Sequence, residues 1–95
     1  MADLVLPLKR EYFEQIKAGT KNVEYRLSTP YWRRRLVGRT FDHVIITLGY
    51  PKRGDTSRRI VRKWRGFLET TIQHKHFGLH PVDVFAIDVS EQPSA

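Results

Sequence analysis

The stretch LKREYFEQIKAGTKNVEYRL, residues Leu8 to Leu27, decides the fold because it predicts a helix, a sharp turn and a strand in immediate succession. Its first half repeats apolar residues at the spacing of one helix face, at Leu8, Tyr12, Phe13 and Ile16. Gly19 follows the predicted end of this helix at Ala18, a position where a residue in the left-handed conformation commonly ends a helix.

The second half, from Asn22 to Leu27, alternates polar and apolar residues with the period of a β-strand. We predict that Val23, Tyr25 and Leu27 face the core and that Asn22, Glu24 and Arg26 form a polar face. Glu24 and Arg26 are then about 7 Å apart at the backbone, close enough to share a ligand. Lys21 precedes them in the turn, and a carboxylate between two cations is expected to stay ionised. The same spacing is also compatible with a surface salt bridge of little consequence.

The rest of the chain is rich in strand signals. Strands are predicted at Leu4–Leu8, Phe41–Leu48, Arg58–Ile72 with a bend near Gly66, and Val82–Val89; a short helix is predicted at Tyr31–Leu36, and loops at Gly49–Ser57 and Gln73–Pro81. Five to six strands with one main and one short helix predict an α+β fold, a small, partly closed and mostly antiparallel β-barrel with the helices beside it. We expect one domain over residues 1–90 and a flexible tail over residues 91–95.

Positive charge is concentrated in the middle third of the chain. The net charge is +7, and the 33–65 segment has eleven basic residues against two acidic ones, whereas the rest has six against eight. These basic residues are Arg33, Arg34, Arg35, Arg39, Lys52, Arg53, Arg58, Arg59, Arg62, Lys63 and Arg65. Such a cluster is typical of a surface that contacts nucleic-acid phosphates, although basic runs are also common on solvated surfaces.

Aromatic residues near this basic segment suit stacking on unpaired bases. Tyr50, in the GYPKRG turn, is expected to be exposed and to belong to the nucleic-acid surface, whereas Trp64 is expected to pack in the core.

The sequence HKHFGLH places three histidines close together, but Lys75 between two of them opposes a bound cation, so no metal site is predicted. His76 is the candidate in this loop for a phosphate contact or for acid–base chemistry.

The composition excludes several classes of protein. With no cysteine, the chain has neither disulfides nor thiolate metal sites, which suits a reducing compartment. The apolar run at the start is short and charge follows it at once, so neither a signal peptide nor a membrane-spanning helix is predicted. We expect a cytoplasmic monomer without a cofactor.

The segment GTKNVEYR and the surrounding layout resemble the ASCH domain family, a member of the PUA-like superfamily. Its signature G-x-K-x-x-E-x-R is matched by Gly19, Lys21, Glu24 and Arg26. The resemblance extends over nearly the whole chain, through the helix ending IKAG, the stretch WRRRLVGRTFDHVIITLGY and the strand VDVFAIDV. It implies a PUA-like barrel, a role linked to RNA, and a ligand cleft between barrel and helix that contains Lys21, Glu24, Tyr25 and Arg26.

Some proteins similar to this family are amidohydrolases that remove an acyl group from a modified cytidine, and others are thought to be ribonucleases. The lysine of the deacylating members corresponds to Lys21, but Glu24 occupies the position of their threonine. If the chain is an enzyme, Lys21 and Glu24 are the candidate catalytic residues, because side-chain chemistry allows Lys21 to act as a base and Glu24 to activate a water.

The sequence is compatible with three functions. The first is binding of RNA, another single-stranded nucleic acid, or a nucleotide, with the ligand in the Lys21–Glu24–Arg26 cleft and the phosphate backbone on the basic surface. The second is hydrolysis of a modified nucleoside, like an N4-acylcytidine amidohydrolase, or of RNA. The third is a basic interaction protein, of phage origin, that contacts an acidic protein partner.

Overall fold

The computed structural model describes residues 2–78 and 80–91 of the chain. The elements follow in the order β1 (Leu4–Leu8), α1 (Arg10–Ala18), β2 (Val23–Leu27), α2 (Pro30–Leu36), β3 (His43–Leu48), η1 (Thr56–Arg58), β4 (Arg59–Lys63), β5 (Phe67–Ile72), η2 (Lys75–Phe77) and β6 (Val82–Asp88). Here η1 and η2 are short 3₁₀ helices. The α+β class is therefore confirmed. Of the predicted tail, residues 92–95 lie outside the described part of the chain.

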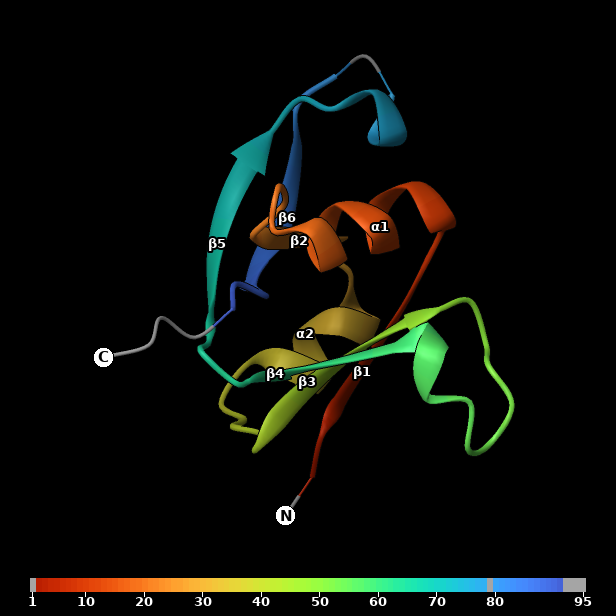
Figure 1. Ribbon diagram of the computed structural model, residues 1–95. Coiled ribbons are helices and arrows are strands. Elements are labelled where there is room, and N and C mark those ends of the chain that lie inside the picture. The colour runs from red at the N-terminus through yellow and green to blue at the C-terminus, as the bar shows by residue number, and fades with distance from the viewer. Residues whose placement is uncertain (1, 79, 92–95) are drawn as a thin grey trace.

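The six strands form two three-stranded sheets (Figure 1), with strand orders β1–β3–β4 and β2–β6–β5. The pairing is parallel between β1 and β3 and antiparallel in the other three pairs. The prediction of five to six mostly antiparallel strands with two helices is thus confirmed. The expectation of a barrel is not met, because hydrogen bonds between the described strands leave the two sheets separate rather than closing them into one barrel.

The predicted long strand from Arg58 to Ile72 is divided between the two sheets. Residues 59–63 form β4 in one sheet, and residues 67–72 form β5 in the other. The chain changes direction at Gly66, whose φ is +89°, a value that glycine adopts without steric cost. The predicted bend at Gly66 is therefore correct, whereas the prediction of one continuous strand is wrong.

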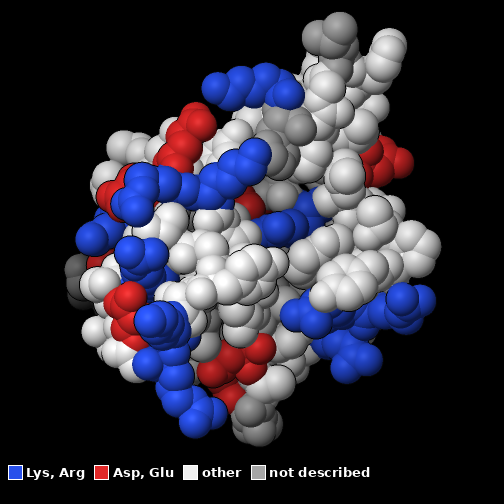
Figure 2. All heavy atoms as spheres, turned by 90° about the vertical axis from the view of Figure 1, so that its right-hand side faces the viewer, with Lys and Arg blue, Asp and Glu red and all other residues white. Residues whose placement is uncertain are grey.

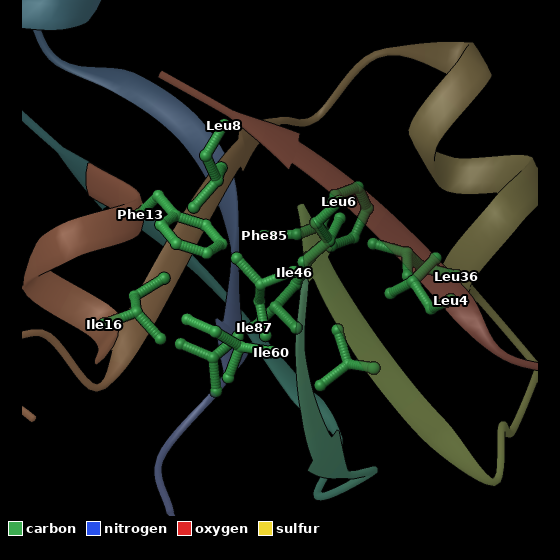
Figure 3. Close-up of a cluster of buried hydrophobic side chains, with 12 residues drawn as sticks. Leu4, Leu6, Leu8, Phe13, Ile16, Leu36, Ile46, Ile60, Phe85 and Ile87 are labelled. Atoms are coloured by element: carbon green, nitrogen blue, oxygen red, sulfur yellow. The ribbon is translucent and has the colours of Figure 1, made fainter. Parts of the chain in front are cut away.

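One hydrophobic core joins the two sheets (Figure 3). Its buried side chains come from both sheets and from both α-helices: Leu4, Leu6, Leu8, Phe13, Ile16, Leu36, Val44, Ile46, Ile60, Phe85, Ile87 and Val89. Figure 3 shows Leu36 of α2 beside Leu4 of β1, and Phe13 and Ile16 of α1 on the other side of the core. Trp64 packs against this core, as predicted.

The end of α1 and the start of α2 each have an identifiable signal. Gly19, with φ +81°, ends α1, and the backbone N–H groups of Thr20 and Lys21 donate to the carbonyl of Gln15. Thr29 is the N-cap of α2, where its hydroxyl oxygen accepts from the backbone N–H of Trp32 at 3.3 Å. Within the described residues, no helix is long and apolar enough to cross a membrane.

Candidate functional site

A cleft of about 250 Å³ opens beside β2, between α1, α2 and the segment that contains η2. It is lined by Tyr12, Lys21, Glu24, Tyr25, Arg26, Leu27, Thr29, Trp32, His74 and Phe77. The cleft therefore contains all four of the residues that the sequence predicted as ligand-binding: Lys21, Glu24, Tyr25 and Arg26.

A partly buried group of three charged residues lies in this cleft. The Nζ of Lys21 is 3.6 Å from Oε1 of Glu24, and Nη2 of Arg26 is 3.2 Å from Oε2 of the same carboxylate. The side chains are 15%, 9% and 21% exposed for Lys21, Glu24 and Arg26, respectively. Two cations share one carboxylate, so the group has a net charge of +1 when all three residues are ionised. We call it the Lys21–Glu24–Arg26 cluster.

The orientation of β2 differs from the sequence prediction. Glu24 is the buried residue of this strand, while Leu27 is 39% exposed and Val23 and Tyr25 are only partly buried. The alternation itself is correct, but the face with Glu24 and Arg26 is turned towards the cleft, which α1 and α2 border. The polar face of the strand is consequently the more enclosed one.

The turn after α1 places Lys21 at the entrance to β2. Its backbone N–H donates to the carbonyl of Gln15 at 3.2 Å, which fixes the chain next to the last turn of the helix. The ammonium group then lies over two aromatic rings, 5.4 Å from the ring centroid of Tyr12 and 5.2 Å from that of Tyr25. These cation–π contacts hold the ammonium close to the carboxylate of Glu24.

Arg26 is fixed by β1 and α2 as well as by Glu24. Its Nη2 donates to the carbonyl of Pro7 at 2.9 Å, and its guanidinium lies 5.3 Å from the ring centroid of Trp32. Its buried Nε has no hydrogen-bond partner among the described residues. The contacts with Glu24, Pro7 and Trp32 fix the guanidinium in the wall of the cleft.

Burial changes the protonation equilibria of the cluster. The pKa of Glu24 is raised above its usual value of 4.5, because removal of the carboxylate from water outweighs the lowering by Arg26 and Lys21. The sequence predicted that the two cations would keep Glu24 ionised, but it contained no sign of this burial. Burial also lowers the pKa of Arg26, which nonetheless stays charged at neutral pH.

The other walls of the cleft come from segments that are distant in sequence. Tyr12 is on α1, Trp32 on α2, and His74 and Phe77 lie in or next to η2. The ring of His74 is 6.4 Å from that of Tyr12 and 6.3 Å from that of Phe77. In the sequence, Tyr12 belongs to the predicted inner face of a helix and Phe77 to a predicted loop, and no local pattern indicates that both line one cleft.

The residues of the predicted nucleic-acid surface differ in whether they form ion pairs or hydrogen bonds within the described chain. Arg33, Arg58 and Arg65 pair with Glu69, Asp55 and Asp88, respectively. Arg39, Arg59 and Arg62 donate to backbone carbonyls. Arg34, Arg35, Lys52, Arg53 and Lys63 make no ion pair with any described residue. Figure 2 shows the Lys and Arg side chains of one face in several separate groups with uncharged side chains between them.

Two further candidates from the sequence are Tyr50 and His76. Tyr50 is 91% exposed, as predicted. His76 is in η2, but its side chain is not among those that the structure describes. Across the described residues, no three histidine or carboxylate side chains are close enough to hold a metal ion.

Comparison with known proteins gave no relative from which a function could be transferred. No protein-family model matches the chain, and neither a curated protein nor a solved structure matches it significantly.

Proposed function

We propose that the protein is an RNA-binding domain of the ASCH type, which holds one nucleotide of a single-stranded RNA in the cleft. The observation that carries this proposal is the Lys21–Glu24–Arg26 cluster, partly buried in an aromatic-walled cleft of about 250 Å³. The G-x-K-x-x-E-x-R pattern on which the resemblance rests supplies all three charged residues of the cluster.

The chemistry of the cleft fits a nucleotide. Rings such as Tyr12, Tyr25 and Trp32 offer apolar faces on which a base stacks. Lys21 and Arg26 offer donors to base acceptors or phosphate oxygens, while Glu24 accepts from an exocyclic amino group. The two cations outnumber the carboxylate, so the cluster attracts a ligand that carries negative charge.

Calorimetric titration with nucleosides, nucleoside monophosphates and short RNA tests the proposal. Lys21→Ala is expected to weaken binding by about tenfold to a hundredfold, the usual effect of removing a hydrogen bond to a charged group. Lys17→Ala is the matched control, because this lysine lies in the last turn of α1 and does not line the cleft. Binding that is equally strong in the Lys21→Ala and Lys17→Ala proteins would show that RNA does not use the cleft.

A second candidate function, hydrolysis of an acylated cytidine or of RNA, is favoured by one observation. Glu24 has a raised pKa in a cleft, and such carboxyl groups are candidates for acid–base catalysis. In this function Glu24 would activate a water and Lys21 would stabilise the developing negative charge. Incubation with acylated cytidines and with RNA tests it: turnover should be lost in Lys21→Ala and in Glu24→Gln. Equal product formation by the unaltered and Lys21→Ala proteins would exclude an enzymatic role of the cleft.

A further inference from the structure

A second hollow lies on the other side of α2. It is an open groove of about 530 Å³, lined by Ala2, Asp3, Tyr31, Arg34, Arg35, Arg39 and Phe41. Three of these seven residues are arginines, and Tyr31 is 54% exposed. We call this hollow the arginine groove. It shares no lining residue with the cleft, so it is a separate feature of the surface.

A row of stacked cations and rings connects the cleft with the arginine groove. The guanidinium of Arg26, in the cleft, lies 5.3 Å from the ring centroid of Trp32, and that of Arg35 lies 5.4 Å from the same centroid. Arg35 also lies 5.4 Å from the ring centroid of Tyr31. Trp32 and Tyr31 meet edge to face at 5.3 Å. The indole of Trp32, which lines the cleft, therefore contacts one arginine of the cleft and one arginine of the arginine groove.

The arginine groove has more positive charge than its own residues neutralise. No carboxylate of the described chain is within ion-pair distance of Arg34, Arg35 or Arg39. Asp3 also lines the groove, but its Oδ1 lies 3.3 Å from Nδ1 of His43. Arg33, the neighbour of Arg34 on α2, differs in forming a 2.8 Å ion pair with Glu69.

Two arginines of the groove are held in place by the rest of the protein. The guanidinium of Arg35 lies against the rings of Tyr31 and Trp32, and its buried Nε makes no hydrogen bond with a described residue. Nε of Arg39 is engaged instead, because it donates to the carbonyl of Arg34 at 2.8 Å and thereby holds the segment after α2 against the helix. Arg35 and Arg39 are thus fixed in place without a carboxylate partner among the described residues, and such guanidinium groups suit the oxygens of a phosphate group.

We propose that the arginine groove binds the sugar–phosphate backbone of a single-stranded nucleic acid whose neighbouring nucleotide occupies the cleft. The inference rests on the proposed function and makes it more specific, because it identifies the ligand as a strand rather than a free nucleotide. The strand crosses α2 at Trp32, phosphates contact Arg34, Arg35 and Arg39, and a base stacks on the exposed ring of Tyr31.

The double variant Arg34→Ala/Arg39→Ala tests the inference, with binding of RNA and DNA hexamers measured by fluorescence anisotropy over a range of salt concentrations. We expect hexamer affinity at low salt to fall about tenfold or more, and the slope of log K against log salt to decrease by about 1.4, because each phosphate contact with a single strand contributes about 0.7. Nucleoside binding in the cleft should be unchanged. The matched control is Arg10→Ala/Lys17→Ala on α1, which removes the same charge away from both hollows.

The variants separate a failure of the groove from a failure of the cleft. Hexamer binding that responds to Lys21→Ala but equals the control in Arg34→Ala/Arg39→Ala would overturn the groove inference and leave the cleft proposal standing. Hexamer binding that responds to the groove variant but not to Lys21→Ala would overturn the cleft proposal, and with it the path of the strand across Trp32, while supporting the phosphate contacts in the groove. Arg34→Lys/Arg39→Lys, which keeps the charge, should retain most of the affinity; a loss as large as that of the alanine variant would overturn the phosphate contact.

Discussion

Glu24 and Arg26 are two residues apart on β2, and Nη2 of Arg26 lies 3.2 Å from Oε2 of Glu24 on the enclosed face of that strand. The same Nη2 donates to the carbonyl of Pro7 on β1, a strand of the other sheet. Arg26 therefore links the two sheets at the point where the cleft opens. The ion pair has a structural role and a place in the candidate site at the same time.

The raised pKa of Glu24 predicts a pH dependence of stability. An unfolded chain releases this proton near pH 4.5, whereas the folded chain holds it to a higher pH. Between these two pKa values the folded state binds more protons than the unfolded state. The contribution of Glu24 to the free energy of unfolding is therefore largest below pH 4.5 and falls as the pH rises through the folded-state pKa. Urea unfolding of the unaltered protein and of Glu24→Gln, from about pH 4 to about pH 8, should show this fall only in the former.

Glu14→Gln is the control for that measurement. Glu14 is on the exposed side of α1, where its carboxylate lies 3.9 Å from Arg10 and its side chain is 52% exposed. This variant should keep the pH profile of the unaltered protein, because an exposed pair contributes little. Parallel profiles for the unaltered and Glu24→Gln proteins would contradict the raised pKa.

The local sequence pattern groups the charged residues of the candidate site, whereas their place in a cleft was expected only from the family resemblance. Lys21, Glu24 and Arg26 are close in sequence, so helix end, turn and strand period suffice to bring them together. Which face of β2 is enclosed depends on α1 and α2, whose docking is a tertiary property. The alternation of β2 therefore grouped its side chains correctly. However, the predicted inward face was that of Val23, Tyr25 and Leu27, whereas the buried residue is Glu24.

The same limit explains the errors in the fold. The run from Arg58 to Ile72 has strand character throughout, and Gly66 indicated a bend, but local pattern does not say that a chain passes from one sheet to another there. The walls of the cleft show this most clearly. Tyr12 and Phe77 are far apart in sequence and were assigned to a helix face and to a loop, yet both line the cleft.

Gly19 is predicted to support both the helix end and the position of Lys21. Its φ of +81° is costly for residues with a side chain, although a Cβ at this position would meet no atom within 4 Å. Gly19→Ala should therefore lower the free energy of unfolding by about 1 kcal/mol through backbone strain alone. Gly19→Asn should cost less, because asparagine tolerates the left-handed region. If the unaltered protein and Gly19→Ala had the same free energy of unfolding in urea, this role of Gly19 would be contradicted.

The two faces of the β1–β3–β4 sheet should differ sharply in their sensitivity to truncation. Ile46 on β3 is fully buried, so Ile46→Ala should destabilise the protein by about 3 kcal/mol through lost burial and a residual cavity. Val61 on β4 is 57% exposed, so Val61→Ala should cost less than about 0.5 kcal/mol. Thermal or urea unfolding measures both values, and a similar loss in both variants would show that the sheet is buried on both faces.

The two tryptophans of the chain should report separately on the cleft and on the core. Trp32 lines the cleft next to Arg26, whereas Trp64 packs against Phe41 with ring centroids 4.9 Å apart. A base that stacks in the cleft should quench the fluorescence of Trp32, because the indole and the base come into contact. Titration of Trp64→Phe with a mononucleotide should therefore show quenching similar to that of the unaltered protein. Trp32→Phe should show almost none while retaining the emission of Trp64, and quenching that persists in Trp32→Phe would place the ligand outside the cleft.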